Sequence, residues 1–122
     1  MEFALSEEQE ILSESVRKML EDNIDIDLLR NHSKGDDVIR GNIRQLVVEM
    51  GLPGILIPEE FGGSGLGVLE AALIAEEFGR YAVPTPWIGN SVMAPIALLY
   101  EKGNSLSEKW LPLIASGEIT AC

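Results

Sequence analysis

The sequence between residues 50 and 81 restricts the fold of this chain more than any other stretch. Its first part is a short apolar segment, Ile55-Leu56-Ile57, which lies between two prolines. Four glycines then fall within residues 62–67, and the largely apolar stretch 68–78 follows. Prolines on both sides favour an extended conformation for the first segment, and the glycines permit a tight turn. We therefore expect an extended segment, a turn and a central helix that is buried on most of its faces.

The glycine-rich turn has the composition of a phosphate-binding loop but not its spacing. A P-loop requires Gly-Lys-Ser/Thr after its glycines, whereas Leu66-Gly67-Val68 stands here. In the dinucleotide-binding fingerprint, the third glycine would fall on Val68 or on Glu70. We interpret the glycines as architectural. Valine at Gly63 or Gly65 should then lower stability, because a β-branched residue resists a positive φ.

The 3.6-residue apolar period of a helix recurs in four other segments, at about 6–22, 37–50, 90–100 and 105–117. Ser6 and Gln9 form a capping-box pattern at the start of the first, and Gly51 stands where the second needs a left-handed cap. Pro95 must either lie in the first turn of its helix or kink it. The polar segment 23–37 is typical of a loop. The sequence thus predicts an all-α fold of about five helices with no convincing sheet.

Composition excludes several classes of protein. With 46% hydrophobic and 24% charged residues, the chain can bury the core of one domain. Twenty acidic against nine basic residues give a net charge of −11, which repels nucleic acid and a bare anionic membrane. No apolar run approaches the ~20 residues of a transmembrane helix. The single cysteine, Cys122, permits no intramolecular disulfide, and Glu2, Glu7 and Glu8 do not suit a secretory signal. We therefore expect an acidic cytoplasmic protein.

None of the reactive residues forms a recognisable catalytic group. The acidic pairs Glu59-Glu60 and Glu76-Glu77 lack a histidine or nucleophile nearby in the sequence and are interpreted as solvated faces or helix caps. His32 has no second metal ligand at a recognisable spacing, and the surroundings of Cys122 do not indicate a reactive thiol. Trp87 is interpreted as a packing anchor that could also line a cavity. Residue chemistry alone predicts a helical domain without a catalytic constellation.

Three motifs give the chain a resemblance to a known family. They are Gly51-Leu52-Pro53-Gly54-Ile55, Ile57-Pro58-Glu59-Glu60-Phe61-Gly62-Gly63-Ser64-Gly65 and Glu76-Glu77-Phe78-Gly79-Arg80. In this order and spacing they resemble the N-terminal helical domain of the FAD-dependent acyl-CoA dehydrogenases. The resemblance extends to residues 3–9 and 110–118 and so covers nearly the whole chain. It implies a helical bundle, up-and-down or orthogonal, at 1–118, with 119–122 as the start of a middle β-domain.

The resemblance implies one part of an enzyme. Family members remove the pro-R α-hydrogen and a β-hydride from an acyl-CoA thioester, and the hydride passes to FAD. The catalytic base, usually a glutamate, and most flavin contacts belong to the middle β-domain and a C-terminal helical domain. We therefore expect this chain to hold no FAD and to be inactive by itself, while it supplies one wall of the acyl and flavin pocket. Its expected partners are acyl-CoA and the remaining dehydrogenase domains or a partner subunit, in a homo- or hetero-oligomer.

The same resemblance nominates site residues. The helix after the proline-rich connection lines the acyl pocket in the family, and Gly89-Asn90-Ser91 matches a family motif there. This match implies that Thr85, Ile88 and Val92 face the substrate. Cys122 falls where the flavin-contacting stretch of the family opens, which implies a backbone contact with the cofactor.

The connection Val83-Pro84-Thr85-Pro86 resembles members that form half of a heteromeric dehydrogenase or act on bulky or dicarboxylic acyl groups. Two alternatives to the interpretation as one domain of a catalytic dehydrogenase stay open. One is a non-catalytic subunit of a heteromeric dehydrogenase, and the other is a self-contained helical module that binds a protein partner through an apolar groove.

Overall fold

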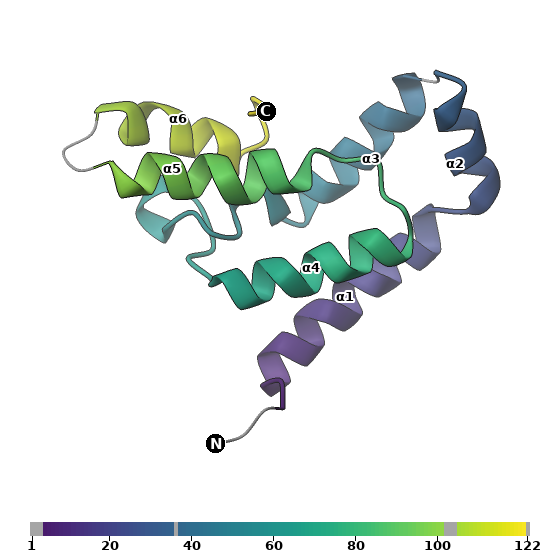
Figure 1. Cartoon of the computed structure of the whole chain (residues 1–122), viewed down its shortest axis with the longest axis horizontal. Coiled ribbons are helices and arrows are strands. Elements are labelled where there is room, and N and C mark those ends of the chain that lie inside the picture. Colours follow the sequence, from purple (N-terminus) through teal and green to yellow (C-terminus); the bar gives the residue numbers. More distant parts are fainter. Residues whose placement is uncertain (1–3, 36, 102–104, 122) are drawn as a thin grey trace.

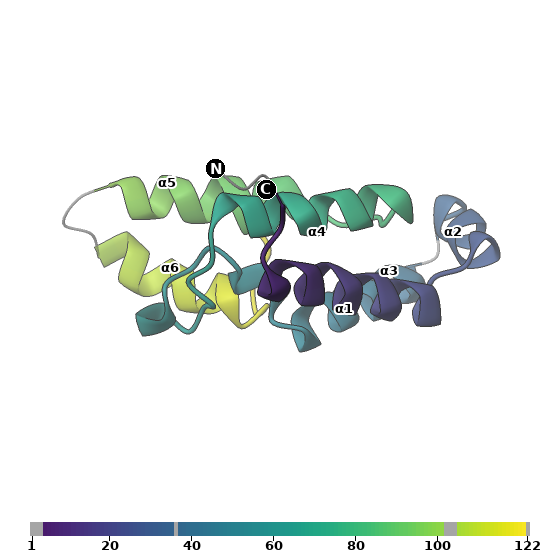
Figure 2. The ribbon, with the colours of Figure 1, turned by 90° about the horizontal axis from the view of Figure 1, so that it is seen from below.

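The computed structural model describes residues 4–35, 37–101 and 105–121, which are helical without any strand, as the sequence predicts. Its elements form two layers (Figures 1 and 2). One layer contains α4 (Val68–Arg80) and a longer helix made of the π-helical η3 (Ile88–Met93) and α5 (Ala94–Tyr100). The other contains α1 (Glu7–Asn23), α3 (Asp37–Glu49) and α6 (Ser105–Ala115). Helix α2 (Ile26–Ser33) lies at one end, and the 3-10 turns η1 (Leu52–Gly54) and η2 (Glu59–Phe61) link α3 to α4.

The predicted helix ends are confirmed where local chemistry determines them. The hydroxyl of Ser6 accepts from the backbone N–H of Gln9 at 3.2 Å, and the Gln9 side chain accepts from the Ser6 N–H at 3.0 Å. This capping box begins α1 at the predicted residue. Gly51, just after α3, has a φ of +69°, the left-handed conformation expected of a C-terminal cap.

The prediction that residues 23–37 form a loop is wrong, because this segment contains α2. The carboxylate of Asp25 accepts from the backbone N–H of Leu28 at 2.7 Å, which is the contact of an N-cap residue. Leu28 and Leu29 then pack against the main core. The described residues therefore contain six α-helices where the sequence predicts about five.

The expectation of an extended segment at Ile55-Leu56-Ile57 is also wrong. Ile55 has right-handed helical angles, φ −56° and ψ −41°, and its N–H donates to the Leu52 carbonyl at 3.1 Å. The Ile57 N–H donates to the Gly54 carbonyl at 3.0 Å, so consecutive tight turns carry the chain. Pro53 lies at the start of η1, where a missing N–H leaves no helical bond unmade. Its presence therefore does not enforce an extended backbone.

Pro95 lies in the first turn of α5, and the π-helical turn of η3 precedes it. The Ala94 N–H donates to the Gly89 carbonyl, five residues back. In a regular α-helix the Pro95 ring would collide with the carbonyl four residues earlier, and a widened turn relieves this contact. Of the two sequence alternatives, the position of Pro95 in the first turn of its helix is confirmed.

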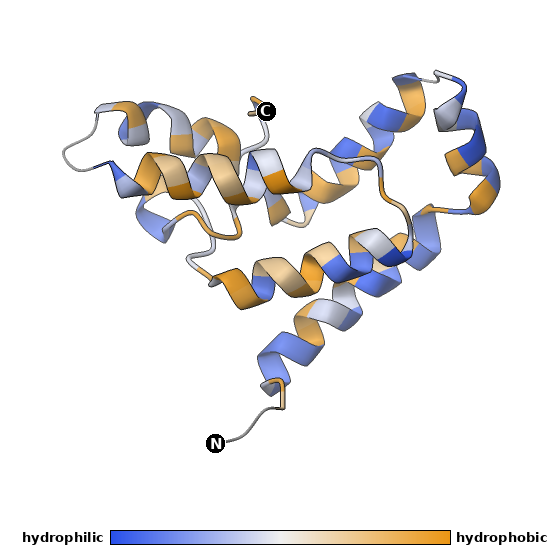
Figure 3. Ribbon diagram, viewed as in Figure 1, coloured by the Kyte–Doolittle hydropathy of each residue, from blue (hydrophilic) through white to orange (hydrophobic). Residues whose placement is uncertain are grey.

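One core joins the two layers, and a smaller one lies under α6. The main core is formed by buried residues that include Val16, Leu20, Ile43, Val47, Leu52, Ile74 and Phe78. The smaller core contains Ile57, Leu111, Ile114 and Ala115. Helix α4 buries the side that faces α1 and the Trp87 ring, while Val68 is 63% and Leu69 52% exposed. The expectation that 68–78 is buried on most faces is therefore wrong for the described chain. The N-terminal end of α4 is nevertheless largely apolar (Figure 3).

Candidate functional site

The three predicted substrate residues lie around the connection between α4 and η3. Thr85 lines two neighbouring grooves, and Ile88, which is 54% exposed, lines the smaller one. Val92 is half-buried and packs against the main core, and it lines neither groove. The structure thus brings Thr85 and Ile88 together, and Val92 supports the helix from beneath. Their role as a substrate wall stays a prediction.

The smaller groove, of about 270 Å³, lies against the end of α4. Phe78 and Trp87 form part of its lining, with ring centroids 5.1 Å apart in an edge-to-face contact. The Trp87 indole N–H donates to the Ala71 carbonyl at 3.3 Å, which fixes the ring in the core. Trp87 is therefore both a packing anchor and part of a cavity wall, as the sequence analysis allows.

The larger groove has a volume of about 660 Å³, the size of a ligand pocket. Its walls come from α3, η1, the Pro84–Pro86 connection, η3 and residues 117–120. Apolar side chains such as Val47 and Ile119 alternate there with the polar Thr85 and Ser91. Two arginines, Arg40 and Arg44, are the charged residues of the lining within the described part of the chain.

Two long-range hydrogen bonds fix the walls of this larger groove. The Arg44 guanidinium donates to the Gly117 carbonyl at 2.6 Å, which ties the end of α6 to α3. The buried Asn90 accepts from the Ala121 N–H at 2.7 Å through its Oδ1 atom and holds the C-terminal segment against η3. The lining residues 117–120 are therefore held at both ends.

The glycine-rich turn offers no phosphate cradle. The N–H groups of Gly63, Ser64, Gly65 and Leu66 donate to carbonyls of the preceding turns, those of Pro58, Gly54, Ile57 and Ile55. A Cβ atom at Gly63 would collide with the backbone carbonyl of Ile57. Gly65 has a φ of +62°. These four N–H groups are engaged in hydrogen bonds within the turns and are not available to the phosphates of FAD. This agrees with the interpretation of the glycines as architectural.

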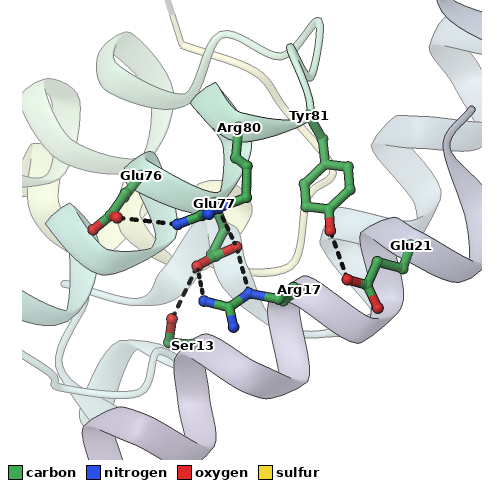
Figure 4. A network of polar contacts seen from close by, with 7 residues as sticks. All are labelled: Ser13, Arg17, Glu21, Glu76, Glu77, Arg80 and Tyr81. Carbon is green, nitrogen blue, oxygen red and sulfur yellow. Dashed lines mark hydrogen bonds and ion pairs between the residues drawn. The ribbon is translucent and has the colours of Figure 1, made fainter. Parts of the chain in front are cut away.

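A buried carboxylate, Glu77, joins α4 to α1 (Figure 4). Its side chain is 2% exposed and receives hydrogen bonds from Arg17 Nη2 at 2.7 Å, Arg17 Nε at 3.1 Å and Ser13 Oγ at 3.2 Å. Arg80 Nε lies 3.4 Å from Glu77 Oε2, the oxygen that also accepts from Arg17 Nε. The bonds from Arg17 lower the pKa of the Glu77 carboxyl below its ordinary value of 4.5. This carboxylate is ionised and neutralised by arginine, which is the arrangement of a structural clamp and not of a general base.

The interpretation of both acidic pairs as solvated faces or caps is therefore wrong for Glu77. Its neighbour Glu76 is exposed and pairs with Arg80 at 3.3 Å, and Glu59 and Glu60 are also exposed. The helical period of α4 contains the missed signal, since Glu77 follows Ile74 by three residues and precedes Phe78 on the buried stripe. A second link between the helices runs from Gln9 Nε2 to Glu70 Oε1 at 2.8 Å.

Other candidates from the sequence contribute no chemistry within the described residues. No group of three or more His, Cys, Asp or Glu side chains there could hold a metal ion. Cys122 lies outside the described residues, as does the side chain of His32. None of the helices in the described ranges is long and apolar enough to cross a bilayer.

The fold and the grooves define a small all-helical domain with a ligand-sized groove and a helix pair joined by a buried carboxylate. The model of the acyl-CoA dehydrogenase N-terminal domain matches residues 6–118, and the chain belongs to the acyl-CoA dehydrogenase family as its N-terminal domain. The resemblance in the sequence and the all-α fold class are thereby confirmed.

Three relatives illustrate the similarity. Acyl-CoA dehydrogenase IpdE2 of Mycolicibacterium smegmatis is 38% identical over 96 residues, which are 78% of this chain and 30% of the relative. Acryloyl-CoA reductase (NADH) of Anaerotignum propionicum is 32% identical over 118 residues, 96% of this chain and 29% of the relative. (2S)-Methylsuccinyl-CoA dehydrogenase of Cereibacter sphaeroides is 32% identical over 120 residues, which are 94% of this chain and 21% of the relative. The chain thus spans less than a third of the length of these relatives. No solved structure gives a significant match.

Proposed function

We propose that this chain is the N-terminal helical domain of a flavin-dependent enzyme that dehydrogenates an acyl-CoA thioester at its α,β bond, and that it supplies one wall of the acyl and flavin pocket. The match of the family domain over residues 6–118 carries the proposal. Residues 1–118 are proposed as the domain and 119–122 as the start of a middle β-domain. We place the protein in the cytoplasm, on the ground of its single cysteine and acidic composition.

The proposed wall consists of Thr85 and Ile88, with Val92 behind them. Its support is that both side chains border an apolar groove whose back is the fixed Trp87 ring. Apolar walls with few polar groups suit an acyl chain. Val92 contributes by packing the helix that carries Ile88 onto the core.

The proposed docking surface for the other dehydrogenase domains is the set of exposed apolar side chains on the layer of α4 and α5. It comprises Leu66, Val68, Leu69, Met93, Ile96, Leu99 and Tyr100, which are 39% to 87% exposed. We call it the α4–α5 surface. The two helices form one outer layer (Figure 2), and both ribbons are largely apolar (Figure 3). A concentration of large exposed apolar residues is typical of a surface that another part of a protein covers.

The proposed cofactor of the complete protein is FAD, held by the other domains. The glycine-rich turn of this chain has its N–H donors engaged internally, and a phosphate finds no cradle there. The Glu77 carboxylate is occupied by Arg17, so the proposed catalytic base also belongs elsewhere. We accordingly propose that the chain alone is inactive and does not retain flavin.

A chimera tests the proposal. Residues 6–118 replace the matching segment of Mycolicibacterium smegmatis IpdE2, and flavin absorbance and acyl-CoA oxidation are measured on the purified protein. We expect flavin retention and activity in the chimera, and neither in the chain alone. A stoichiometric flavin spectrum with acyl-CoA turnover in the chain alone would overturn the inactive-alone proposal, and a folded chimera without flavin would overturn the shared pocket.

Matched variants separate docking from folding. Ile96→Glu places a charge on the α4–α5 surface, where Ile96 is 44% exposed, and Ile26→Glu places the same charge on α2, where Ile26 is 63% exposed. Both variants should keep the helical circular dichroism of the isolated chain. In the chimera, Ile96→Glu should cause loss of flavin and Ile26→Glu should not. Equal flavin content in the two variants would exclude the α4–α5 surface as the docking site.

A further inference from the structure

The larger groove concentrates positive charge on a chain that is otherwise strongly acidic. The chain has a net charge of −11 and only nine basic residues. Two of these, Arg40 and Arg44, line the groove one helical turn apart on α3, and among the described residues no carboxylate belongs to its lining. A cation pair in a partly enclosed groove attracts a negatively charged group, while the rest of the surface repels it.

The arginines differ in how firmly the described structure holds them. Arg44 donates to the Gly117 carbonyl at 2.6 Å, and this bond positions its guanidinium at the wall. Arg40 lies 3.7 Å from the Asp37 carboxylate, and the two side chains are 65% and 86% exposed. An ion pair that is this exposed to water contributes little binding energy, so Asp37 holds Arg40 only weakly. The planar guanidinium of Arg40 can therefore turn from Asp37 to a carboxylate or phosphate in the groove.

The remainder of the groove suits an apolar body attached to that anion. Val47, Pro53, Pro84 and Ile119 supply apolar wall, and the hydroxyl of Ser91, with 2% of the residue exposed, is fixed in the floor beside Asn90. Thr85 borders this groove and the smaller apolar groove, so the two are neighbours on either side of one residue.

We propose that the larger groove binds the anionic group of the acyl thioester, a carboxylate on the acyl part or a phosphate of the CoA part, with Arg40 and Arg44 as its cationic partners. The choice of an acyl thioester rests on the proposed function. The anion site itself rests on the charge and shape of the groove.

Binding to the isolated chain tests this site without any need for activity. Amide NMR shifts of the 122-residue chain are followed during titration with octanedioate and its dimethyl ester, and with CoA and pantetheine. Each pair shares a body and differs in its anionic groups. We expect the anionic member of at least one pair to shift the groove amides and to bind about tenfold more tightly than its neutral counterpart. If octanedioate binds more tightly than its ester, the anion is assigned as a carboxylate of the acyl part. If CoA binds more tightly than pantetheine, it is assigned as a phosphate of the CoA part.

Arg40→Gln is the deciding variant, and Arg30→Gln is its matched control. Arg30 forms the same kind of exposed pair three residues from an aspartate, at 3.4 Å from Asp27, but lies on α2 away from the groove. We expect Arg40→Gln to weaken anion binding about tenfold and Arg30→Gln to leave it unchanged. Arg44→Gln should act similarly if its circular dichroism shows that it folds without the Gly117 bond.

The proposal is overturned if neither anion binds more tightly than its neutral counterpart, or if Arg40→Gln and Arg30→Gln behave alike. Such a result would leave the outcome of the chimera experiment standing, because that experiment measures flavin retention and acyl-CoA oxidation and not the binding of an anion to the isolated chain. Conversely, a failed chimera with intact anion binding would refute the dehydrogenase pocket and retain the anion site.

Discussion

Replacing Glu77 with glutamine should lower the free energy of unfolding by about 1–2 kcal/mol at neutral pH. The carboxylate accepts two hydrogen bonds from Arg17, at 2.7 and 3.1 Å. A bond to a charged group contributes about 1 kcal/mol more than a neutral one, so two bonds give about 2 kcal/mol. The Arg17 side chain is 41% exposed, and water screens part of that gain. Urea unfolding followed by circular dichroism measures the difference.

Glu76→Gln is the control for this prediction. It removes the same charge one residue away, but Glu76 is 66% exposed and meets Arg80 at 3.3 Å in an open pair. We expect a change within about 0.5 kcal/mol. Equal destabilisation by the two substitutions would mean that the overall charge matters and that the buried clamp between α1 and α4 does not.

The stabilisation from Glu77 should depend on pH in a defined direction. Arg17 lowers the folded-state pKa of this carboxyl below the ordinary value of 4.5. A lowered folded-state pKa gives stability that is fully present above 4.5 and is lost as the pH falls through the folded-state pKa. The difference in unfolding free energy between the wild-type chain and Glu77→Gln should therefore be constant near neutrality and shrink in acid. A difference that grows on acidification would refute the assignment.

Two further sites give sharp expectations for urea unfolding. Gly63→Ala should cost about 3 kcal/mol or more, because its Cβ would meet the Ile57 carbonyl, whereas Gly41→Ala, with open space on α3, should stabilise by about 0.5–1 kcal/mol. A tolerated Gly63→Ala would contradict the tight docking of the turn. Asn90→Ala should cost about 1–3 kcal/mol and shift the Ala121 amide in NMR spectra, because that N–H loses its acceptor. An unmoved Ala121 amide would show that the contact is unimportant in solution.

Local sequence signals predicted the helices wherever a cap and an apolar period coincided. The Ser6 box and the Gly51 cap are contacts between residues close in the chain, so their residue types were enough. Helix α2 carries such a signal as well, in the Asp25 cap, but its eight residues show too little period to stand out from the polar segment. The turns at 55–57 could not be inferred, because their prolines suit both extended and 3-10 backbone.

The structure gives Gly63 a different reason for its expected effect on stability than the sequence did. A positive φ was expected at Gly63 and Gly65, and the described backbone has it at Gly65 alone of the two. Gly63 is constrained by the close approach of the Ile57 carbonyl, a contact between turns six residues apart. Sequence composition shows that a glycine is tolerated at such a position, but it does not distinguish a conformational need from a steric one.

The site was predictable only where a family motif reached it. Gly89-Asn90-Ser91 located the start of the helix after the proline-rich connection, which is η3. The walls of the groove beside it are fixed by bonds from Arg44 to Gly117 and from Ala121 to Asn90, which join residues 73 and 31 positions apart. No helical period encodes such pairs. These bonds also have a physical consequence, since they attach the segment after α6 to both walls of the groove. If a further domain follows residue 118 as proposed, its docking must act on the same segment, and the shape of the anion groove should respond to it.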